Sequence, residues 1–149
     1  MTVRIATAAD VDAVAALRRA WAEEESGPVD DGGAFELGFA DWYAAEAGRR
    51  TAWLAAAGEE PVGMLNLVEF RRMPRPGRPR SGWGYISNLF VLAEHRNGGL
   101  GRALLEAAVG AAKQREYARL VLSPSPRAVP LYERVGFTRA DELMLLPLS

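Results

Sequence analysis

The sequence predicts an α/β domain with one central mixed sheet and helices on both of its faces. Two observations predict it. Apolar residues recur every three or four positions in several segments, as on one face of a helix, and short runs rich in β-branched and aromatic residues lie between them. Antiparallel hairpin signals come first and one parallel strand–helix–strand crossover follows. We therefore expect six to seven strands, in the order β-α-α-β-β-β-α-β-α-β, in a single domain over residues 1–149.

The N-terminal part of the chain supplies a strand and two helices. Residues 3–6 read as a short strand, and Thr7 is a typical N-cap for the helix that follows it. The apolar face of that helix consists of Val11, Val14, Leu17 and Trp21, and its end is expected to fray near residues 23–25. The turn-rich segment 26–33 separates it from a second helix over about 35–47, whose apolar face carries Phe35, Phe39 and Trp42.

The middle of the chain predicts a hairpin followed by a long loop. Residues 51–57 and 62–70 read as two strands around a short turn. Residues 71–84 contain too many proline, glycine and arginine residues for regular structure, so we expect an exposed loop there. Residues 85–91 then form the next strand.

The C-terminal part contains the crossover. A helix is expected over about 100–115, followed by a strand over 117–123. A short helix over about 126–135 ends at Gly136, a favourable residue after a helix C-terminus. Residues 137–148 can supply a last strand.

Composition excludes several classes of site. The chain has 149 residues, of which 49% are hydrophobic and 25% charged, and its net charge of −1 gives no general attraction to nucleic acid or to acidic membranes. It has no cysteine and one histidine, His95, so thiolate chemistry, disulfides, sulfur-ligated metals and multi-histidine metal sites are excluded, and no metal is expected. No apolar run reaches the ~18 residues of a membrane span, and the first residues do not resemble a signal peptide. We therefore expect a cytoplasmic protein.

The segment HRNGGLGRALL, residues 95–105, is a candidate phosphate-binding loop. Glycines let the backbone approach an anion closely, and the first N–H groups of a helix have no partner within the helix. A plain glycine-rich turn between a strand and a helix is the alternative. A P-loop needs Gly-Lys-Ser/Thr, which is absent, and a dinucleotide fold needs an acidic residue ~20 positions further on, where Arg119 lies instead.

Three segments together resemble the GNAT superfamily of acyl-CoA-dependent N-acetyltransferases. Arg96-x-x-Gly99-x-Gly101 is similar to its pyrophosphate-binding loop, and AVPLYERVGF, residues 128–137, is similar to its C-terminal motif of a tyrosine before Gly-Phe. RIATAADVDAVAAL resembles its first strand and helix, and the predicted order of elements is also the family's order. The resemblance covers essentially the whole chain.

The resemblance implies acetyl-CoA as cosubstrate and assigns the residues that hold it. The pyrophosphate would lie on the loop formed by Arg96, Asn97, Gly98, Gly99, Leu100, Gly101 and Arg102. The backbone of Phe90, Val91 and Leu92 would pair with the pantetheine arm, where this strand splays from the next, and one N–H would polarise the thioester carbonyl. Ser125 occupies the position of an asparagine in many members. It is expected to cap the last helix and to reach the pantetheine arm less well.

The catalytic roles implied by the resemblance centre on Tyr132. A phenol with an ordinary pKa near ~10 is a suitable proton donor to a departing thiolate. Where many members carry a carboxylate that takes the proton of the amine, this chain has Ser87 and Asn88, which cannot accept one at neutral pH. They could instead hold a water that passes the proton on, or Glu69 could be the base. Glu24 and Glu36 are weaker candidates.

The acceptor is not readable from the sequence. The acidic segment of Glu23, Glu24, Glu25, Asp30 and Asp31 could attract a cationic amine or be a solvated helix end. The arginines of residues 71–80 could meet an anionic substrate or an acidic partner, or keep the loop soluble. That loop lacks the interleaved aromatics of a nucleic-acid binder.

The sequence therefore predicts an N-acetyltransferase that transfers acetyl from acetyl-CoA to a primary amine of a small molecule or peptide, by direct attack in a ternary complex. The alternative is a non-catalytic acyl-CoA-binding sensor or interaction module on the same fold. No nucleic-acid or membrane partner is expected, and a homodimer is left open.

Overall fold

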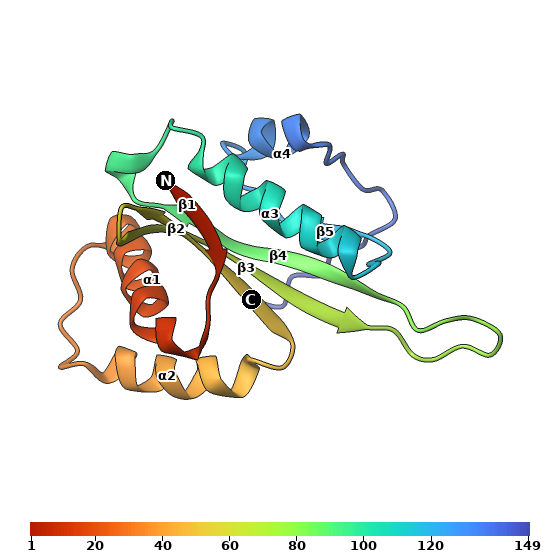
Figure 1. The fold of residues 1–149 in the computed structure, drawn as a ribbon, viewed down its shortest axis with the longest axis horizontal. Helices are drawn as coiled ribbons and strands as arrows, with labels where there is room; N and C mark the ends of the chain where they lie inside the picture. The colour runs from red at the N-terminus through yellow and green to blue at the C-terminus, as the bar shows by residue number, and fades with distance from the viewer.

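The computed structural model describes all 149 residues of the chain (Figure 1). Five strands form the sheet: β1 (Thr2–Ile5), β2 (Arg50–Ala57), β3 (Glu60–Arg71), β4 (Gly82–Val91) and β5 (Leu120–Leu122). Four helices surround it: α1 (Val11–Ser26), α2 (Ala34–Glu46), α3 (Leu100–Gln114) and α4 (Val129–Val135). Single 3₁₀ turns, η1 (Ala8–Asp10) and η2 (Ala93–His95), precede α1 and α3. This confirms the predicted mixed α/β architecture up to α4.

The strands lie in the order β1-β2-β3-β4-β5. The first four are antiparallel neighbours, whereas β5 is parallel to β4 and is reached through α3. The register between β3 and β4 shifts near the middle of β4, because Met64 pairs with Phe90 whereas Asn66 pairs with Ser87. Asn88 and Leu89 therefore both lie opposite the same residue of β3, and this arrangement is a β-bulge.

Helices cover both faces of the sheet (Figure 1). On one face, Val14 and Leu17 of α1 pack against Leu54, Met64 and Phe90 of the sheet. On the other face α3 packs against a larger cluster, which contains Trp53, Val62, Leu65, Leu67, Ile86, Val91, Leu100, Leu104, Leu105 and Ala108. The apolar faces predicted for α1 and α3 are thus the buried ones, and the long central strands lie between two cores.

Replacing Leu104 by alanine should lower the free energy of unfolding by about 2–5 kcal/mol, because the Leu104 side chain is fully buried between α3 and the sheet and its removal leaves a cavity. Urea unfolding followed by circular dichroism measures this loss. Leu148→Ala is the control, since Leu148 is 89% exposed and its replacement should leave the unfolding midpoint unchanged. Equal midpoints for both variants would contradict the buried position of Leu104.

The C-terminal part differs from the sequence prediction. The sheet has five strands, so six to seven strands are not confirmed, and residues 138–149 contain no strand. The edge strand β5 spans only three residues, which offers a further strand little backbone to pair with. The last helix begins at Val129 rather than near Pro126. Its N-cap is Ala128 without a side-chain hydrogen bond, so the prediction that Ser125 caps it is wrong.

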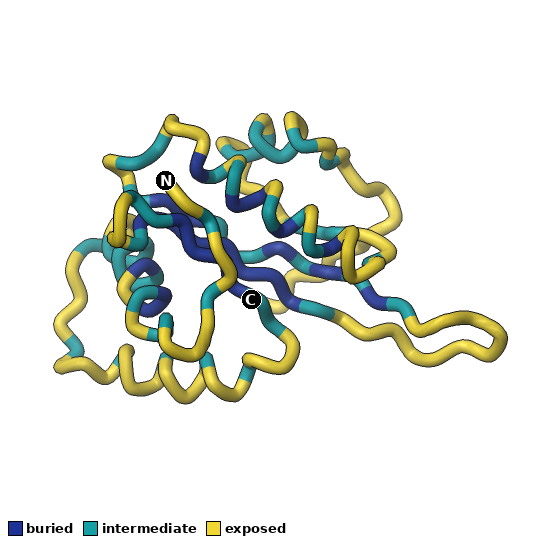
Figure 2. Tube along the Cα trace, viewed as in Figure 1, coloured by how far each residue is buried: buried dark blue, intermediate teal, exposed yellow.

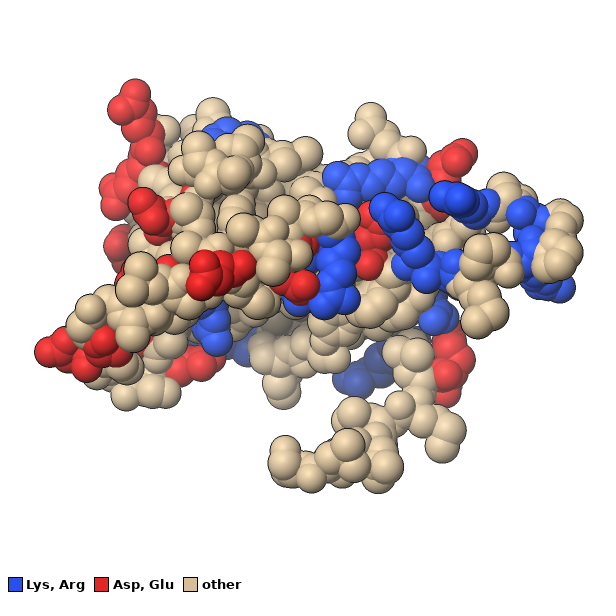
Figure 3. Space-filling view, turned by 90° about the horizontal axis from the view of Figure 1, so that it is seen from below, with Lys and Arg blue, Asp and Glu red and all other residues tan.

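Two segments project from the core with exposed chains, the β3–β4 loop and the C-terminal tail (Figure 2). The tail exposes Leu143, Met144, Leu145, Leu146 and Leu148. The loop is as exposed as predicted, and Figure 3 shows basic side chains gathered at that end of the molecule. No helix is both long and apolar enough to cross a membrane.

Candidate active site

The edge of β4 that faces β5 is open along half its length. Pairing with β5 covers Gly84, Tyr85 and Ile86 only, so residues 87–91 have no strand partner on that side. The N–H of Leu92 donates to the carbonyl of Val62 in β3. Because backbone groups alternate in direction along a strand, those of Val91 point away from β3, toward the open edge. The chain thus offers an extended ligand an unpaired strand edge there.

Of the three residues predicted to pair with the pantetheine arm, Val91 is the one whose backbone N–H is left without a partner in the protein. The Leu92 N–H is already used, and the carbonyl of Val91 accepts from Nε of Arg96 at 2.8 Å. Phe90 is buried, and its ring stacks on Trp21 of α1 with centroids 5.5 Å apart. Phe90 therefore also anchors the edge strand to α1.

The bulge places two candidate polar groups at the start of this open edge. Asn88 has a φ of 56°, in the left-handed region, which asparagine tolerates better than most residues. The Oγ of Ser87 is buried and has no hydrogen-bond partner in the protein. Leaving a buried hydroxyl unpaired costs about 1–3 kcal/mol, so a water or a bound ligand is expected to satisfy it.

The loop before α3 presents a run of unpaired donors. Gly99, at the N-cap of α3, has a φ of 86° that glycine adopts without strain, and α3 has no side-chain cap. None of the backbone N–H groups from Asn97 to Arg102 donates a hydrogen bond to another backbone carbonyl. Together with the helix dipole, these groups form a site suited to an anion such as a phosphate.

The side chain of Arg96 stabilises this loop instead of extending from it. Its two terminal nitrogens hold the carboxylate of Glu24 at 2.8 and 2.7 Å, and its Nε donates to the Val91 carbonyl. The guanidinium also lies 5.5 Å from the centre of the Phe90 ring. Arg96 therefore ties the end of α1, the end of β4 and the glycine loop together.

Glu24 is a poor proton acceptor in this setting. Its hydrogen bonds from Arg96 hold its pKa below the ordinary value, and the positive charge of Arg127 acts in the same direction. Glu36 is similarly held, because Arg19 donates to both of its carboxylate oxygens and lowers its pKa. Both glutamates that were weaker base candidates therefore serve as ion-pair partners.

The Glu24–Arg96 pair predicts a pH dependence of stability. A carboxylate with a lowered pKa in the folded state stabilises the protein above its ordinary pKa, and this contribution is lost as the pH falls through 4.5 toward the folded value. Glu24→Gln should therefore unfold at lower urea than wild type at pH 7, with the difference shrinking near pH 3. Glu23→Gln is the matched control, because Glu23 forms no ion pair. A difference of the same size at both pH values would contradict the pairing.

Glu69, the other candidate base, lies on the face of the sheet opposite to Ser87. Asn66 is the strand partner of Ser87, and Glu69 follows it by three positions, which reverses the direction of the side chain. Its carboxylate is 3.6 Å from Nε of Arg71, near the start of the exposed loop. The structure therefore does not bring Glu69 together with the open edge.

Tyr132 lies on α4, half-buried against the α3 side of the core. Its ring contacts that of Phe137 edge-on, with centroids 5.8 Å apart. Burial raises the pKa of the phenol above its ordinary value, and the nearby phenol of Tyr85 adds to the effect. The hydroxyl thus stays protonated at neutral pH, as a proton donor must.

Sequence reasoning missed a hydrogen bond at the closed end of the strand gap. The hydroxyl of Tyr85 lies 3.1 Å from the Oγ of Ser123, which directly follows β5. This contact bridges the two strands just where their backbone pairing ends. No motif marks Tyr85, and only the register of β4 against β5 places it there. Ser125 itself is exposed, and its carbonyl accepts from the N–H of Ala128.

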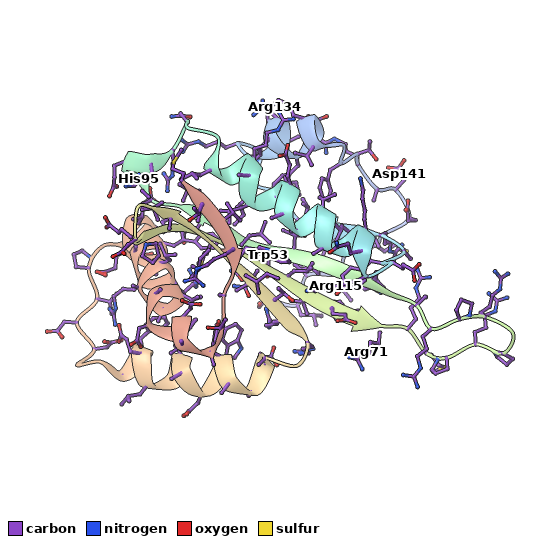
Figure 4. All side chains as sticks on the ribbon, viewed as in Figure 1. Trp53, Arg71, His95, Arg115, Arg134 and Asp141 are labelled. Carbon is purple, nitrogen blue, oxygen red and sulfur yellow. The ribbon has the colours of Figure 1, made fainter.

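Most of the acidic segment between α1 and α2 is already engaged. Asp31 accepts from Arg19 at 2.9 Å, and Glu25 accepts from the indole of Trp21 at 3.0 Å. With Glu24 held by Arg96, only Glu23 and Asp30 are free of side-chain partners. The pattern favours a solvated, internally paired helix end over a binding site for a cation. His95 lies in the η2 turn that leads to α3 (Figure 4).

Two cavities flank the sheet. The larger, of about 800 Å³, lies between α3, β5, α4 and the start of the tail, and Tyr132 and Lys113 are among its lining residues. Lys113, the only lysine of the chain, is in the last turn of α3. The smaller cavity, of about 380 Å³, lies between α2 and the strands β2 and β3. No group of three or more histidine, cysteine, aspartate or glutamate side chains is placed to hold a metal ion.

A match to a family model shows the family to which the chain belongs. The acetyltransferase (GNAT) family matches residues 14–137, which include the bulge, the open edge, the glycine loop and Tyr132. The chain belongs to the acetyltransferase (GNAT) family. GNAT acetyltransferases use acetyl-CoA as cosubstrate, so the resemblance seen in the sequence is confirmed.

Two curated relatives of this GNAT family member are named as acetyltransferases. Mycothiol acetyltransferase of Salinispora arenicola is 35% identical over 109 residues, 66% of this chain. Glucosamine 6-phosphate N-acetyltransferase of Trypanosoma brucei brucei is 29% identical over 87 residues, 58% of this chain. The matched regions cover 35% and 57% of the two relatives, so the chain spans only part of each.

Solved structures share the whole fold. A predicted acetyltransferase of Clostridium acetobutylicum, solved with acetyl-CoA, superposes with a TM-score of 0.77 at 19% identity, covering 99% of this chain and 96% of that one. A GCN5-related N-acetyltransferase of Ralstonia eutropha JMP134 superposes with a TM-score of 0.73 at 26% identity, covering 99% of both chains. The arrangement of five strands and four helices is therefore that of the family.

Proposed function

We propose that this GNAT acetyltransferase transfers the acetyl group of acetyl-CoA to a primary amine of a small molecule or peptide, by direct attack of the amine within a ternary complex. The observation that carries the proposal is the series of unpaired backbone donors that runs from the open edge of β4, residues 87–91, to the start of α3. An extended arm ending in a phosphate group is the kind of ligand that such a series fits.

In this proposal the N–H groups of residues 97–102 hold the pyrophosphate, and the open edge of β4 holds the pantetheine arm. The Val91 N–H is the donor on that edge that the protein leaves unused. A fixed backbone N–H polarises the thioester carbonyl and stabilises the oxyanion formed when the amine attacks. The role of Arg96 is to fix the loop through Glu24 and Val91, while its backbone belongs to the binding segment.

The amine nitrogen attacks the thioester carbon, the C–S bond breaks, and the sulfur takes a proton from the Tyr132 hydroxyl. The amine gives up its own proton to a water held by Ser87 and Asn88, which passes it to solvent, and the Tyr132 phenolate regains a proton from solvent before the next turnover. The buried, unpaired Oγ of Ser87 supports this water, and the ion pairs of Glu24 and Glu36 remove the competing carboxylates. No acyl-enzyme forms on a thiol, because the chain has no cysteine.

A screen of amines tests the activity. Purified protein and acetyl-CoA are incubated with hexosamine phosphates, cysteinyl sugars blocked at the thiol, polyamines, aminoglycosides, amino acids and peptides, and released coenzyme A is detected with a thiol reagent. The absence of cysteine means that the protein itself does not react with the reagent. With at least one amine, coenzyme A should be released, and the mass of that amine should increase by one acetyl group. Binding of acetyl-CoA without release in any reaction would favour the sensor alternative.

A further inference from the structure

The smaller cavity carries an inference that does not depend on acetyl transfer. It lies between α2 and the N-terminal half of the sheet, at about 380 Å³, and is mostly lined by hydrophobic residues. Trp42 and Tyr43 of α2 form one wall, and Ile5 and Val11 contribute from the start of the chain. Its size is in the range of small-molecule sites. Trp42, predicted to be a core residue, is 38% exposed and lines this space instead.

The amide of a largely buried asparagine lines this cavity. Asn66, in the middle of β3, is only 7% exposed and is the single polar residue in the buried core. No side-chain hydrogen bond joins Asn66 to the protein, and its amide is not among the fully enclosed atoms without a partner, so it is accessible from the cavity. An asparagine amide carries two donors and one acceptor, so Asn66 offers both kinds of group to a ligand at the apolar floor.

An arginine without a carboxylate partner lines the same cavity. Arg115, at the end of α3, reaches to the sheet and donates to Thr51 Oγ1 at 3.0 Å (Figure 4). Thr51 and Arg115 line the cavity at the edge of the sheet, where β2 begins, and Asn66 lines it from β3. Unlike Arg50, which pairs with Glu46 at 2.8 Å, Arg115 forms no ion pair.

The charged side chains that line the cavity favour a ligand with a single negative charge. The ionised side chains of the lining are Glu46, Arg50 and Arg115, two cations and one anion. Glu46 is also held by Arg49, and these two arginines lower its pKa to about 2, so it stays ionised at neutral pH. Arg50 further stacks over Trp42 at 4.8 Å, which fixes one wall. Arg115 is left as the free cation at the cavity.

We infer that this cavity binds a small amphipathic carboxylate, with its apolar body against Trp42 and Tyr43, its carboxylate on Arg115 at the edge of the sheet, and a hydrogen bond from the amide of Asn66. Desolvated hydrogen bonds to a charged group give the ligand its orientation, and the apolar walls give most of the buried area. Asn66 is also the strand partner of Ser87, the residue before the bulge. An occupant would therefore lie one strand away from the open edge.

Binding of 3-phenylpropionate, followed by ligand-observed NMR and calorimetry in the absence of acetyl-CoA, tests this inference. Wild type should bind it saturably, and the neutral 3-phenylpropionamide at least about tenfold more weakly, because the amide lacks the charge that Arg115 pairs with. Asn66→Leu and Arg115→Gln should each weaken binding of the acid by about tenfold or more. Arg78→Gln, in the exposed β3–β4 loop, is the matched control and should bind like wild type.

Two results would overturn the inference. The first is that wild type shows no saturable binding up to about 10 mM probe, which would mean that the cavity holds only water. The second is that both variants bind the probe as tightly as wild type. Arg115 is exposed, so its variant should fold even if Asn66→Leu does not. Phenylalanine, which adds an amine to the same body, separates two sources of the ligand. Release of coenzyme A with phenylalanine would identify the occupant as an acceptor, whereas binding without release would identify a separate ligand site.

Discussion

Tyr132→Phe should lower kcat by roughly 10²- to 10⁴-fold, the usual contribution of a positioned general acid. The ring keeps its contacts with Phe137 and the core, so affinity for acetyl-CoA should change by no more than about twofold. Because burial and the nearby Tyr85 raise the pKa of Tyr132, wild-type kcat should show no alkaline decline from loss of this proton below pH ~10. Steady-state kinetics with an amine found in the screen, at several pH values, measure both effects.

Tyr117→Phe is the matched control for this substitution. Tyr117 also packs against the α3 core, and its hydroxyl makes only a 3.5 Å contact with Arg115. Its loss should leave kcat within about twofold of wild type. A Tyr132→Phe enzyme with unchanged kcat would remove the phenol from the proton transfer and leave it a packing residue.

Gly98→Glu should weaken acetyl-CoA binding by about 10²-fold or more. Gly98 does not have the left-handed φ of Gly99, and a Cβ there meets only the His95 carbonyl at 3.9 Å, so the side chain fits without refolding the loop. A carboxylate in this position opposes the negative charge of the pyrophosphate and competes for the N–H groups of residues 97–102. Hydrogen bonds to charged groups are worth about 1.5–3 kcal/mol each, so losing one or two gives an effect of this size.

Gly110→Glu makes the same change of charge and volume on an exposed position of α3, where a Cβ has open space. Calorimetric titration of acetyl-CoA into both variants should find normal affinity for Gly110→Glu. Equal affinities for the two variants would exclude residues 97–102 from the cofactor site.

The helices and strands whose apolar residues recur with a clear period were predictable from the sequence. The elements that depend on pairing with a distant part of the chain were not. In α3 and in the β2–β3 hairpin, the spacing of the apolar residues itself indicates which side chains are buried. The positions of these elements were therefore predicted to within a few residues. The tail was read as a strand because its residues are apolar. Strand formation also needs a partner edge, and the short β5 offers little. Trp42 had the spacing of a core residue, but α2 has no fully buried residue.

The candidate site divides in the same way. The glycine loop and Tyr132 follow from local motifs, and the structure places them at the start of α3 and on α4 as expected. The direction of Arg96 depends on Glu24, 72 positions away in sequence, so the sequence suggested a free cation near the phosphates where the structure has an ion pair. The bulge at Asn88 and the contact of Tyr85 with Ser123 depend on strand register, which no local pattern reveals.

Lys113, alone in the last turn of α3, has a practical consequence for any assay with thioesters. Acyl thioesters modify amines spontaneously, and lysine-rich enzymes accumulate a heterogeneous background of such products. Within residues 1–149 only one side-chain amine can react, since all other basic side chains except His95 are guanidinium groups, which stay protonated and unreactive. Peptide mapping by mass spectrometry can therefore follow self-modification at one lysine side chain, separately from the N-terminal amine. The rate at Lys113 then serves as an internal measure of uncatalysed acyl transfer beside the turnover of a true acceptor.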